Sequence, residues 1–397
     1  MDLKNIINNS GADAWIIYDF ASQNPAFKSI IGDIFLTRKC FVIIKATGRD
    51  IIICHAVDSG TIKKNIDKKY DIIIYKNWNE LILLLKKELQ QFKNVLMEIS
   101  ENGLLPKVSY VDYGTVNLIK NIVREVKSSA DIFQHVTAVM SNESYILHKN
   151  VAIKIDEIKN IAFEYIFKNI KNKKNISEYD VQQKILELFS INNIITDSVP
   201  IVAIGINAND PHYEPTKDSF SLIRQDDLVL IDLWGKYNDE KAVFADITWM
   251  AYIGSTPDKK YIDIFNIVKD SISSGLDFIN NNLPKRKLCG YEIDDVCREY
   301  INRYGYGDYF IHRTGHSLSI GESDHGVGVN IDNYETHDER TLLDGIAFSM
   351  EPGIYLPEFG LREEINVCIQ DNKVIITTPR QAELICLHKN EMKLKYF

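Results

Sequence analysis

The sequence predicts an α+β protein of two domains, and three observations support this prediction. The chain has 397 residues, which is enough for two separate hydrophobic cores. Short β-type runs alternate with helical patterns up to about residue 140, and longer helices and strands follow. Its 45% of apolar and 25% of charged residues are ordinary for a globular protein. We expect one domain over 1–145 and a second over 146–397.

The first domain is expected to be α/β. Apolar β-type runs occur at 14–18, at 70–75 and at 94–99, and a pair of strands surrounds a Thr-Gly turn within 40–54. A helical pattern fills 78–92. Strands and helices therefore alternate along this part of the chain.

The second domain is expected to open on helices, the first from about Ser141 to Asn172 and the next after Ser177, whose side chain can cap it. Another helix should have Thr256 as its cap and Pro257 at its first position. The remaining expected elements are strands within 198–205, 228–235 and 241–252, a helix near 290–305, and mostly strands and loops over the last hundred residues.

Composition argues against several classes of partner. Lys and Arg total 46 against 55 Asp and Glu, a net charge of −9, which disfavours nucleic acid or an anionic membrane as the main partner. The first residues lack the apolar segment of a secretory signal, and runs such as "LILLL" are too short to cross a bilayer. The six cysteines stand singly, which indicates reduced thiols. We expect a cytoplasmic protein.

The stretch "FSMEPGIYLPEFGLREE", residues 348–364, is unusually acidic for a buried region. Pro352 and Gly353 cannot lie inside a helix, and the apolar residues on both sides predict two strands that meet across a loop. Glu351 and Glu364 could then face one another. Two like charges in a core are costly unless a proton or a cation lies between them.

Two aspartates pose the same problem. Asp232 and Asp246 each interrupt an apolar strand, and the polar loop between them predicts that the two strands are neighbours. One such aspartate is usually a cap or a partner of arginine. Four carboxylates together need about four positive charges, from an Arg and Lys cluster or from metal ions, and these strands carry no basic residue before Lys236 and Lys241.

Histidines complete a candidate metal centre. His312, His316, His325 and His337 fall within one glycine-rich segment, and His212 lies in an earlier loop. One histidine with four carboxylates suits Mn²⁺, Co²⁺, Fe²⁺ or Zn²⁺. Such a set can hold two divalent ions about 3.5 to 4 Å apart with a water or hydroxide between them, as in metal-dependent hydrolases.

The order Asp, Asp, His, Glu, Glu resembles the pita-bread metallopeptidases, which include aminopeptidase P, prolidase, methionine aminopeptidase and the metal-free creatinase. The matching segments are "LIDLWG", "ADIT", "HRTGHS", "MEPGIYL" and "GLREEINV", within roughly 147–385. The preceding segment is similar to the creatinase-type amino-terminal α/β domain. The resemblance implies a pita-bread catalytic domain behind that α/β domain, and a homodimer.

The resemblance also implies roles for individual residues. Asp232 would chelate one ion, Asp246 and Glu364 would bridge both, and His316 with Glu351 would bind the other. Glu351 would in addition handle the proton of the attacking water.

Further residues would act around the metals. His212, His312 and His325 would bind substrate and stabilise the tetrahedral intermediate, and Arg362 would lie beside the substrate and orient a bridging carboxylate. Glu363 would point to the opposite face of its strand.

The activity implied is hydrolysis of the Xaa-Pro bond at the amino end of a peptide. It would use two divalent ions per chain, with Mn²⁺ expected ahead of Co²⁺, Zn²⁺ or Fe²⁺. The alternatives are a creatinase-like amide or amidine hydrolase, a binding role, and a different dinuclear hydrolase such as a phosphatase. A serine hydrolase lacks its Gly-x-Ser-x-Gly motif here. Asp324, Trp249 and two lengthened segments, 232–246 and 316–325, depart from the family pattern and bear on substrate preference.

Overall fold

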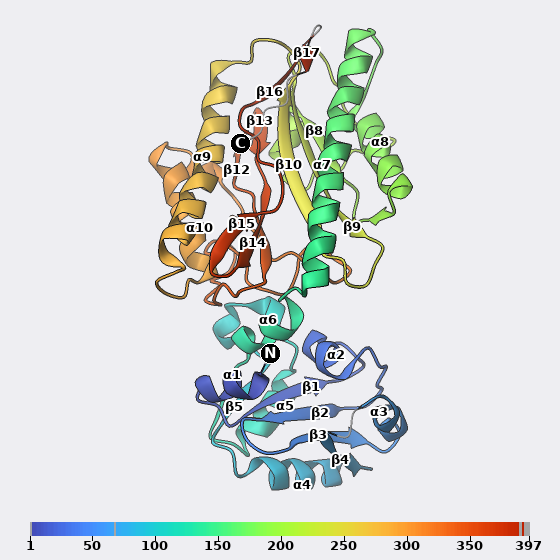
Figure 1. Ribbon diagram of the computed structural model, residues 1–397, viewed down its shortest axis with the longest axis vertical. Coiled ribbons are helices and arrows are strands. Elements are labelled where there is room, and N and C mark those ends of the chain that lie inside the picture. The colour runs from blue at the N-terminus through green and yellow to red at the C-terminus, as the bar shows by residue number, and fades with distance from the viewer. Residues whose placement is uncertain (1, 67–68, 389–390, 393–397) are drawn as a thin grey trace. The chain divides into compact units, whose positions relative to one another are not determined.

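The computed structural model describes residues 2–66, 69–388 and 391–392. The chain divides into two compact units, Met1–Thr137 and Ala138–Phe397 (Figure 1). The division lies before the expected boundary at 145, because the segment ahead of the long helix already bonds to the second unit, with the Met140 amide donating to the Gly345 carbonyl at 2.8 Å.

The first unit is built on one six-stranded mixed sheet in the order β4-β3-β2-β1-β5-β6. One face packs against helices that include the buried leucines of α4, and residues of the opposite face such as Trp15, Ile17 and Val42 are buried as well. The strands are β1 (Ala14–Asp19), β2 (Cys40–Lys45), β3 (Asp50–His55), β4 (Tyr70–Tyr75), β5 (Asn94–Met97) and β6 (Glu125–Ser128). The helices are α1 (Leu3–Asn9), α2 (Pro25–Ile31), α3 (Ser59–Asn65), α4 (Trp78–Leu89), α5 (Tyr113–Lys120) and α6 (Ala130–Thr137).

Four helices flank the strands of the second unit, α7 and α8 on one side and α9 and α10 on the other (Figure 1). They span α7 (Asn142–Lys171), α8 (Glu178–Ile191), α9 (Lys259–Asn282) and α10 (Gly290–Arg303). Ser177 caps α8 as predicted, and Ser141, where the long helix was expected to start, caps α7. The predicted start of α9 at Pro257 is wrong, because the Asp258 carboxylate caps the helix by accepting from the Lys260 amide at 2.7 Å.

Within the described residues, the strands of the second unit form three sheets. The largest contains β7 (Ile194–Ile195), β8 (Ile201–Ile204), β9 (Leu228–Tyr237), β10 (Ala245–Tyr252), β16 (Ile385–His388) and β17 (Glu391–Met392). The others are β11 (Ala347–Met350) with β14 (Ile365–Gln370) and β15 (Lys373–Ile376), and the hairpin of β12 (Gly353–Leu356) and β13 (Phe359–Arg362).

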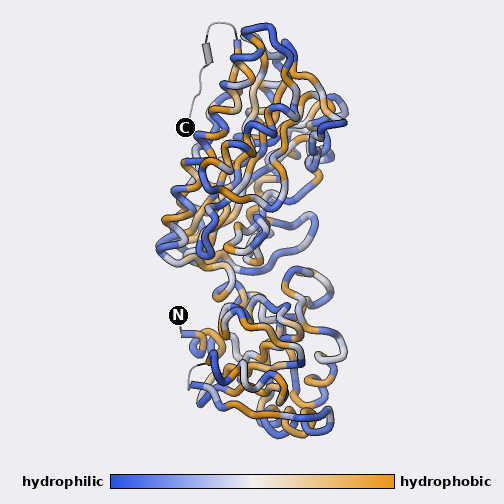
Figure 2. Tube along the Cα trace, turned by 90° about the vertical axis from the view of Figure 1, so that its right-hand side faces the viewer, coloured by the Kyte–Doolittle hydropathy of each residue, from blue (hydrophilic) through white to orange (hydrophobic). Residues whose placement is uncertain are grey.

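The two faces of β9 and β10 belong to different cores. Ile231, Leu233 and Ile247 pack with residues of α7 and α8, whereas Leu230 and Met250 pack with residues of α9. Alternate side chains of a strand point to opposite faces, so this division places Asp232 and Asp246 on the α9 side. Hydrophobic and hydrophilic residues alternate along the helices of this unit, as expected for helices with one buried face (Figure 2).

The acidic stretch 348–364 crosses between two sheets. We expected its apolar flanks to meet across a loop, but β11 pairs with β14, and β12 pairs with β13. The chain leaves the sheet of β11, β14 and β15 at Pro352, which has no amide hydrogen to donate to a neighbouring strand. The β12–β13 hairpin then returns it to Glu364, which lies opposite Glu351 when the β11–β14 register is extended by one residue.

Candidate metal centre

Two adjacent strands place the aspartates. Asp232 pairs with Thr248, and Asp246 with Trp234, so both carboxylates project from the same face of the β9–β10 pair. The side chain of Asn366 in β14 holds the backbone of Asp246 through two hydrogen bonds. Its amide nitrogen donates to the Asp246 carbonyl at 2.7 Å, and its oxygen accepts from the Asp246 amide at 2.8 Å. These bonds join two sheets at the candidate site.

Backbone bonds bring the glutamates to the aspartates. The Glu364 amide donates to the Thr248 carbonyl at 3.1 Å, and the Thr248 hydroxyl donates to Glu364 Oε2 at 3.0 Å. The Glu351 amide donates to the Thr314 carbonyl at 2.7 Å. The predicted meeting of the two pairs of carboxylates is therefore present in the structure.

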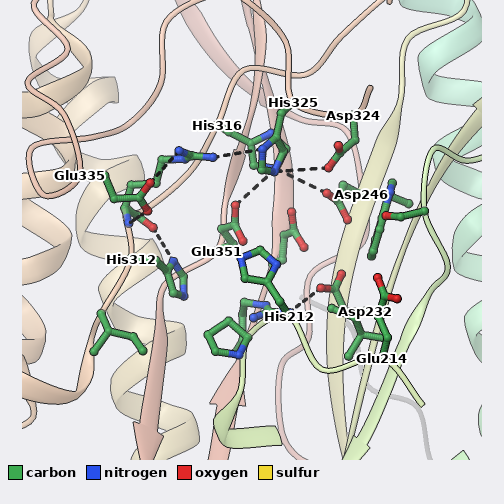
Figure 3. A pocket seen from close by; sticks show the side chains of 18 residues that line it. His212, Glu214, Asp232, Asp246, His312, His316, Asp324, His325, Glu335 and Glu351 are labelled. Carbon is green, nitrogen blue, oxygen red and sulfur yellow. Dashed lines mark hydrogen bonds and ion pairs between the residues drawn. The ribbon is translucent and has the colours of Figure 1, made fainter. Parts of the chain in front are cut away.

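His316 joins the carboxylates from a segment bonded to β11. The Ser317 carbonyl lies 3.2 Å from His316 Nδ1, and because a carbonyl only accepts, Nδ1 donates and Nε2 is the nitrogen left to bind an ion. His316 Nε2 faces Asp246 Oδ2 at 3.6 Å and Glu351 Oε1 at 3.4 Å (Figure 3). All five predicted metal ligands line one cavity of about 500 Å³.

The charges of this cluster are poorly balanced by the protein itself. Burial, and then Glu364 and Asp232, raise the pKa of Asp246 well above its usual value. Burial and then Glu351 do the same to the pKa of Glu364, and burial raises the pKa of Glu351 to about 7. Arg362 Nη2 offsets part of the charge by pairing with Asp232 Oδ2 at 2.5 Å.

Unbonded oxygens show that the cluster fits divalent metal ions. Among the described residues, Asp232 Oδ1, Asp246 Oδ1 and Glu364 Oε1 are buried and have no hydrogen-bond partner. Asp246, His316 and Glu364 offer ligand atoms that all lie within 4.8 Å of one another. Buried oxygens without donors beside an imidazole nitrogen are a donor set that suits Mn²⁺ or a similar divalent ion.

His325 packs against His316, with ring centroids 3.9 Å apart and the ring planes tilted by 44°. Arg313 Nη2 lies 3.2 Å from His325 Nδ1, and because a guanidinium only donates, Nδ1 accepts and Nε2 carries the hydrogen. Arg313 is itself held by Glu335, through Nη1 to Oε2 at 3.0 Å. His325 therefore offers a hydrogen-bond donor at Nε2.

His312 lies in the cavity wall with both ring nitrogens bonded. Nδ1 donates to the Arg313 carbonyl at 2.7 Å, and Nε2 accepts from the Tyr355 hydroxyl at 2.8 Å, which in turn accepts from Arg362 Nη1 at 2.7 Å. Burial, and then Arg362, lower the pKa of His312 to about 3, so the ring is neutral. A continuous hydrogen-bonded line thus joins His312 to Asp232.

His212 is exposed on the loop after the 3₁₀ turn Gly205–Asn209 and lines the same cavity (Figure 3). Glu178, fully buried in the first turn of α8, anchors this loop. Its carboxylate accepts from the Ile204 amide at 2.8 Å, from Asn207 Nδ2 at 3.0 Å, and from the Tyr213 hydroxyl and Ser221 amide at 2.7 Å each.

Two residues near the centre face away from it. Glu363 is buried outside the cavity, 3.5 Å from Arg380 Nε, as its strand position predicted. Trp249, which departs from the family pattern, lies on the α7 side of β10 with Lys159 Nζ 3.1 Å from its ring centroid. It is therefore separated from the carboxylates by the sheet.

Sequence reasoning missed the residues that position this site. Glu178, Tyr355 and Asn366 make bonds to groups as far as 120 residues away, and Arg313 selects the tautomer of a neighbouring histidine. Local patterns carry no signal for such contacts. No helix in the described ranges has the length and apolarity required to cross a membrane.

Comparisons with known proteins agree with this geometry. The model of metallopeptidase family M24 matches residues 153–371. The Xaa-Pro dipeptidase of Pyrococcus furiosus is 30% identical over 271 residues, which cover 67% of this chain and 70% of that protein.

Solved structures share the fold. The prolidase of Pyrococcus horikoshii OT3 superposes with a TM-score of 0.62 at 23% identity, over 96% of this chain and 98% of that one. The N-terminal domain of the FACT complex subunit SPT16 from chickpea superposes with a TM-score of 0.64 at 11% identity, over 94% and 93%. At these identities the likeness establishes the predicted fold, an α/β domain followed by a pita-bread domain.

Proposed function

Because the chain belongs to metallopeptidase family M24, we propose that it hydrolyses the Xaa-Pro bond at the amino end of peptides with two divalent metal ions. The observation that carries the proposal is that four carboxylates and His316 line one cavity. Three of these carboxylates have a buried oxygen with no hydrogen-bond donor among the described residues. The preference for proline is supported by a relative named Xaa-Pro dipeptidase, of which this chain covers 70%.

Five side chains would hold the ions. Asp232 would bind one ion, His316 and Glu351 would bind the other, and Asp246 and Glu364 would contact both; all five side chains line one cavity. The oxygen-rich set favours Mn²⁺, with Co²⁺, Zn²⁺ and Fe²⁺ as alternatives. When bound, the ions supply a water of lowered pKa and polarise the carbonyl of the scissile bond.

Glu351 moves the proton. Its carboxylate lies beside His316 at the edge of the cluster and accepts from the Ser349 hydroxyl at 3.0 Å. From this position it takes the proton of the attacking water and passes it to the leaving nitrogen. The leaving nitrogen, here the ring nitrogen of proline, needs that proton to depart as an amine, as in any peptide bond.

The remaining residues bind and orient the substrate. His325 donates its Nε2 hydrogen to the developing oxyanion, since Arg313 occupies Nδ1. His212 contacts the peptide from its exposed loop. His312 and Arg362, tied together through Tyr355, shape the wall and hold Asp232 in place.

A panel of peptides tests this proposal. We expect the Mn²⁺-loaded chain to cleave an Xaa-Pro dipeptide or an Xaa-Pro-Yaa tripeptide, and the metal-stripped chain to cleave neither. A matched Xaa-Ala peptide is the control for proline preference. Release of amino-terminal methionine, or hydrolysis of a non-peptide amide, without Xaa-Pro cleavage would reject the proline specificity.

A binding role without hydrolysis is the second candidate. The likeness to the SPT16 domain supports it, because that domain has the same fold and belongs to a subunit of a complex. The candidate ligands favour the enzyme, and a metal titration separates the two, since a binding module would take up no divalent ion at this site.

We further propose a cytoplasmic homodimer. The six cysteines are all free, which suits a reducing compartment. The dimer follows from the family resemblance alone, and analytical ultracentrifugation tests it.

A further inference from the structure

Asp324 brings an additional carboxylate to the candidate centre. It is 9% exposed and lines the same cavity as the five proposed ligands. The segment that carries it folds back on itself, through the bridge between Leu318 and His325. His316, Asp324 and His325 offer ligand atoms that all lie within 4.8 Å of one another (Figure 3).

The surroundings of Asp324 add negative charge. The Asp324 amide donates to Asp197 Oδ2 at 3.3 Å, which places a second carboxylate beside Asp324. A buried carboxylate among others is stabilised by a cation between them.

Both groups of candidate ligands share His316. One group is His316, Asp324 and His325, and the other is Asp246, His316 and Glu364. His316 Nδ1 donates to Ser317, so Nε2 is the nitrogen left to bind an ion, and one nitrogen lone pair binds one ion. An ion held by either group through Nε2 would therefore be the ion that His316 binds. Asp246 Oδ1 and Glu364 Oε1, buried and without hydrogen-bond partners in the described residues, face the same cavity.

We propose that Asp324 is a sixth protein ligand, bound to the ion that His316 holds. The inference rests on the metal centre of the proposed function and is independent of the peptide substrate. His325 remains a hydrogen-bond donor, with Nε2 3.5 Å from Asp324 Oδ2. An added carboxylate strengthens the binding of hard ions such as Mn²⁺.

Calorimetric titration of the metal-stripped chain with Mn²⁺, in the absence of substrate, tests the proposal. We expect Asp324→Asn to weaken one of two binding steps by about 10- to 100-fold or more, because even residues that only support ligands have effects of that size. Glu322→Gln is the matched control, since Glu322 is an exposed carboxylate of the same segment, and its affinities should equal those of the wild type.

Unchanged Mn²⁺ affinity in Asp324→Asn would overturn the proposal. So would a loss of kcat at unchanged affinity, which would make Asp324 a residue that orients His325. Should Asp324→Asn not fold, Asp324→Glu gives a second comparison: the absorption spectrum of bound Co²⁺ should change if residue 324 is a ligand, and an unchanged spectrum would contradict it.

The same titration separates this inference from the proposed function. A wild-type chain that binds no ion would overturn both. A wild-type chain that binds two ions but cleaves no Xaa-Pro bond would reject the substrate only, and weakened binding in Asp324→Asn would still support the sixth ligand.

Discussion

Single hydrogen bonds give two neighbouring histidines different chemistry. Because the Ser317 carbonyl can only accept, His316 donates from Nδ1 and Nε2 is the nitrogen left to bind an ion. Because Arg313 can only donate, His325 accepts at Nδ1 and carries its hydrogen at Nε2. The first suits a metal ligand, and the second suits a donor to an oxyanion. Residue type alone does not distinguish these two roles.

The assignment of His325 predicts a specific kinetic effect. His325→Ala should lower kcat by about 10²-fold or more, the usual effect of removing one oxyanion donor. Metal analysis should find both ions retained. His337→Ala is the control, because His337 lies outside the cavity lining and bonds to Asn333. An unchanged kcat, or loss of an ion, would refute the donor role.

Asp246 should matter to both ions at once. Asp246→Asn is expected to lose activity and metal while remaining folded, because the Asn366 bonds reach the backbone of residue 246 and the remaining carboxylates repel each other less. Metal content and circular dichroism check this outcome. Wild-type turnover with two bound ions would disprove the bridging assignment.

At the scale of elements, the position of the loop that carries His212 depends on the first turn of helix α8. Glu178 of α8 accepts hydrogen bonds from four groups of the segment 204–221, which contains His212. In Glu178→Gln the side-chain NH₂ group would replace one accepting oxygen and face hydrogen-bond donors. The unsatisfied donors should lower the free energy of unfolding by about 1–3 kcal/mol. The loosened loop should raise KM while both ions stay bound.

Glu187→Gln provides the comparison for that variant, because Glu187 is on the same helix but pairs with Lys184 at the surface. Steady-state kinetics on an Xaa-Pro substrate give the answer. Equal KM values for both variants would show that the Glu178 contacts do not position the loop.

Elements differed in how well the sequence predicted them. The strands that carry Asp232 and Asp246 were predictable, because long apolar runs around a polar loop leave few alternatives. The pairing of β11 with β14 was not, since strand partners far apart in sequence leave no local pattern. The start of α9 was misplaced because Thr256, Pro257 and Asp258 are all acceptable at a helix start.

At the scale of the molecule, burial makes stability depend on pH. The pKa values of Glu98 in the first unit and of Glu351 and Glu363 in the second are each raised to about 7 by burial. A raised carboxylate pKa gives stability that is complete below the usual value and is lost as pH rises through 7. The metal-free chain should therefore become less stable between pH 5 and pH 8.

Metal ions should reverse this trend in the second unit only. Because Mn²⁺ binds ionised carboxylates, its stabilisation should grow as pH rises. Urea unfolding with and without Mn²⁺ at several pH values measures the effect, and Glu98→Gln isolates the share of the first unit. Equal pH dependence with and without Mn²⁺ would contradict this account.

At the scale of the molecule, the sequence predicts the five proposed ligands for two reasons. Buried charge without compensation needs a cation, and the ordered motifs match a known family. The supporting contacts were not, since Asn366, Tyr355 and Glu178 act through partners that only the fold brings near. Asp324 was visible in the sequence as a departure, but its place beside His316 was not.

The most direct test of the central claim is Xaa-Pro hydrolysis by the metal-stripped chain as Mn²⁺ is added back, with bound metal counted in each sample. We predict no hydrolysis without metal and a rate that rises until two ions are bound per chain. Full activity with metal content near zero, or two bound ions with no Xaa-Pro cleavage, would contradict the claim.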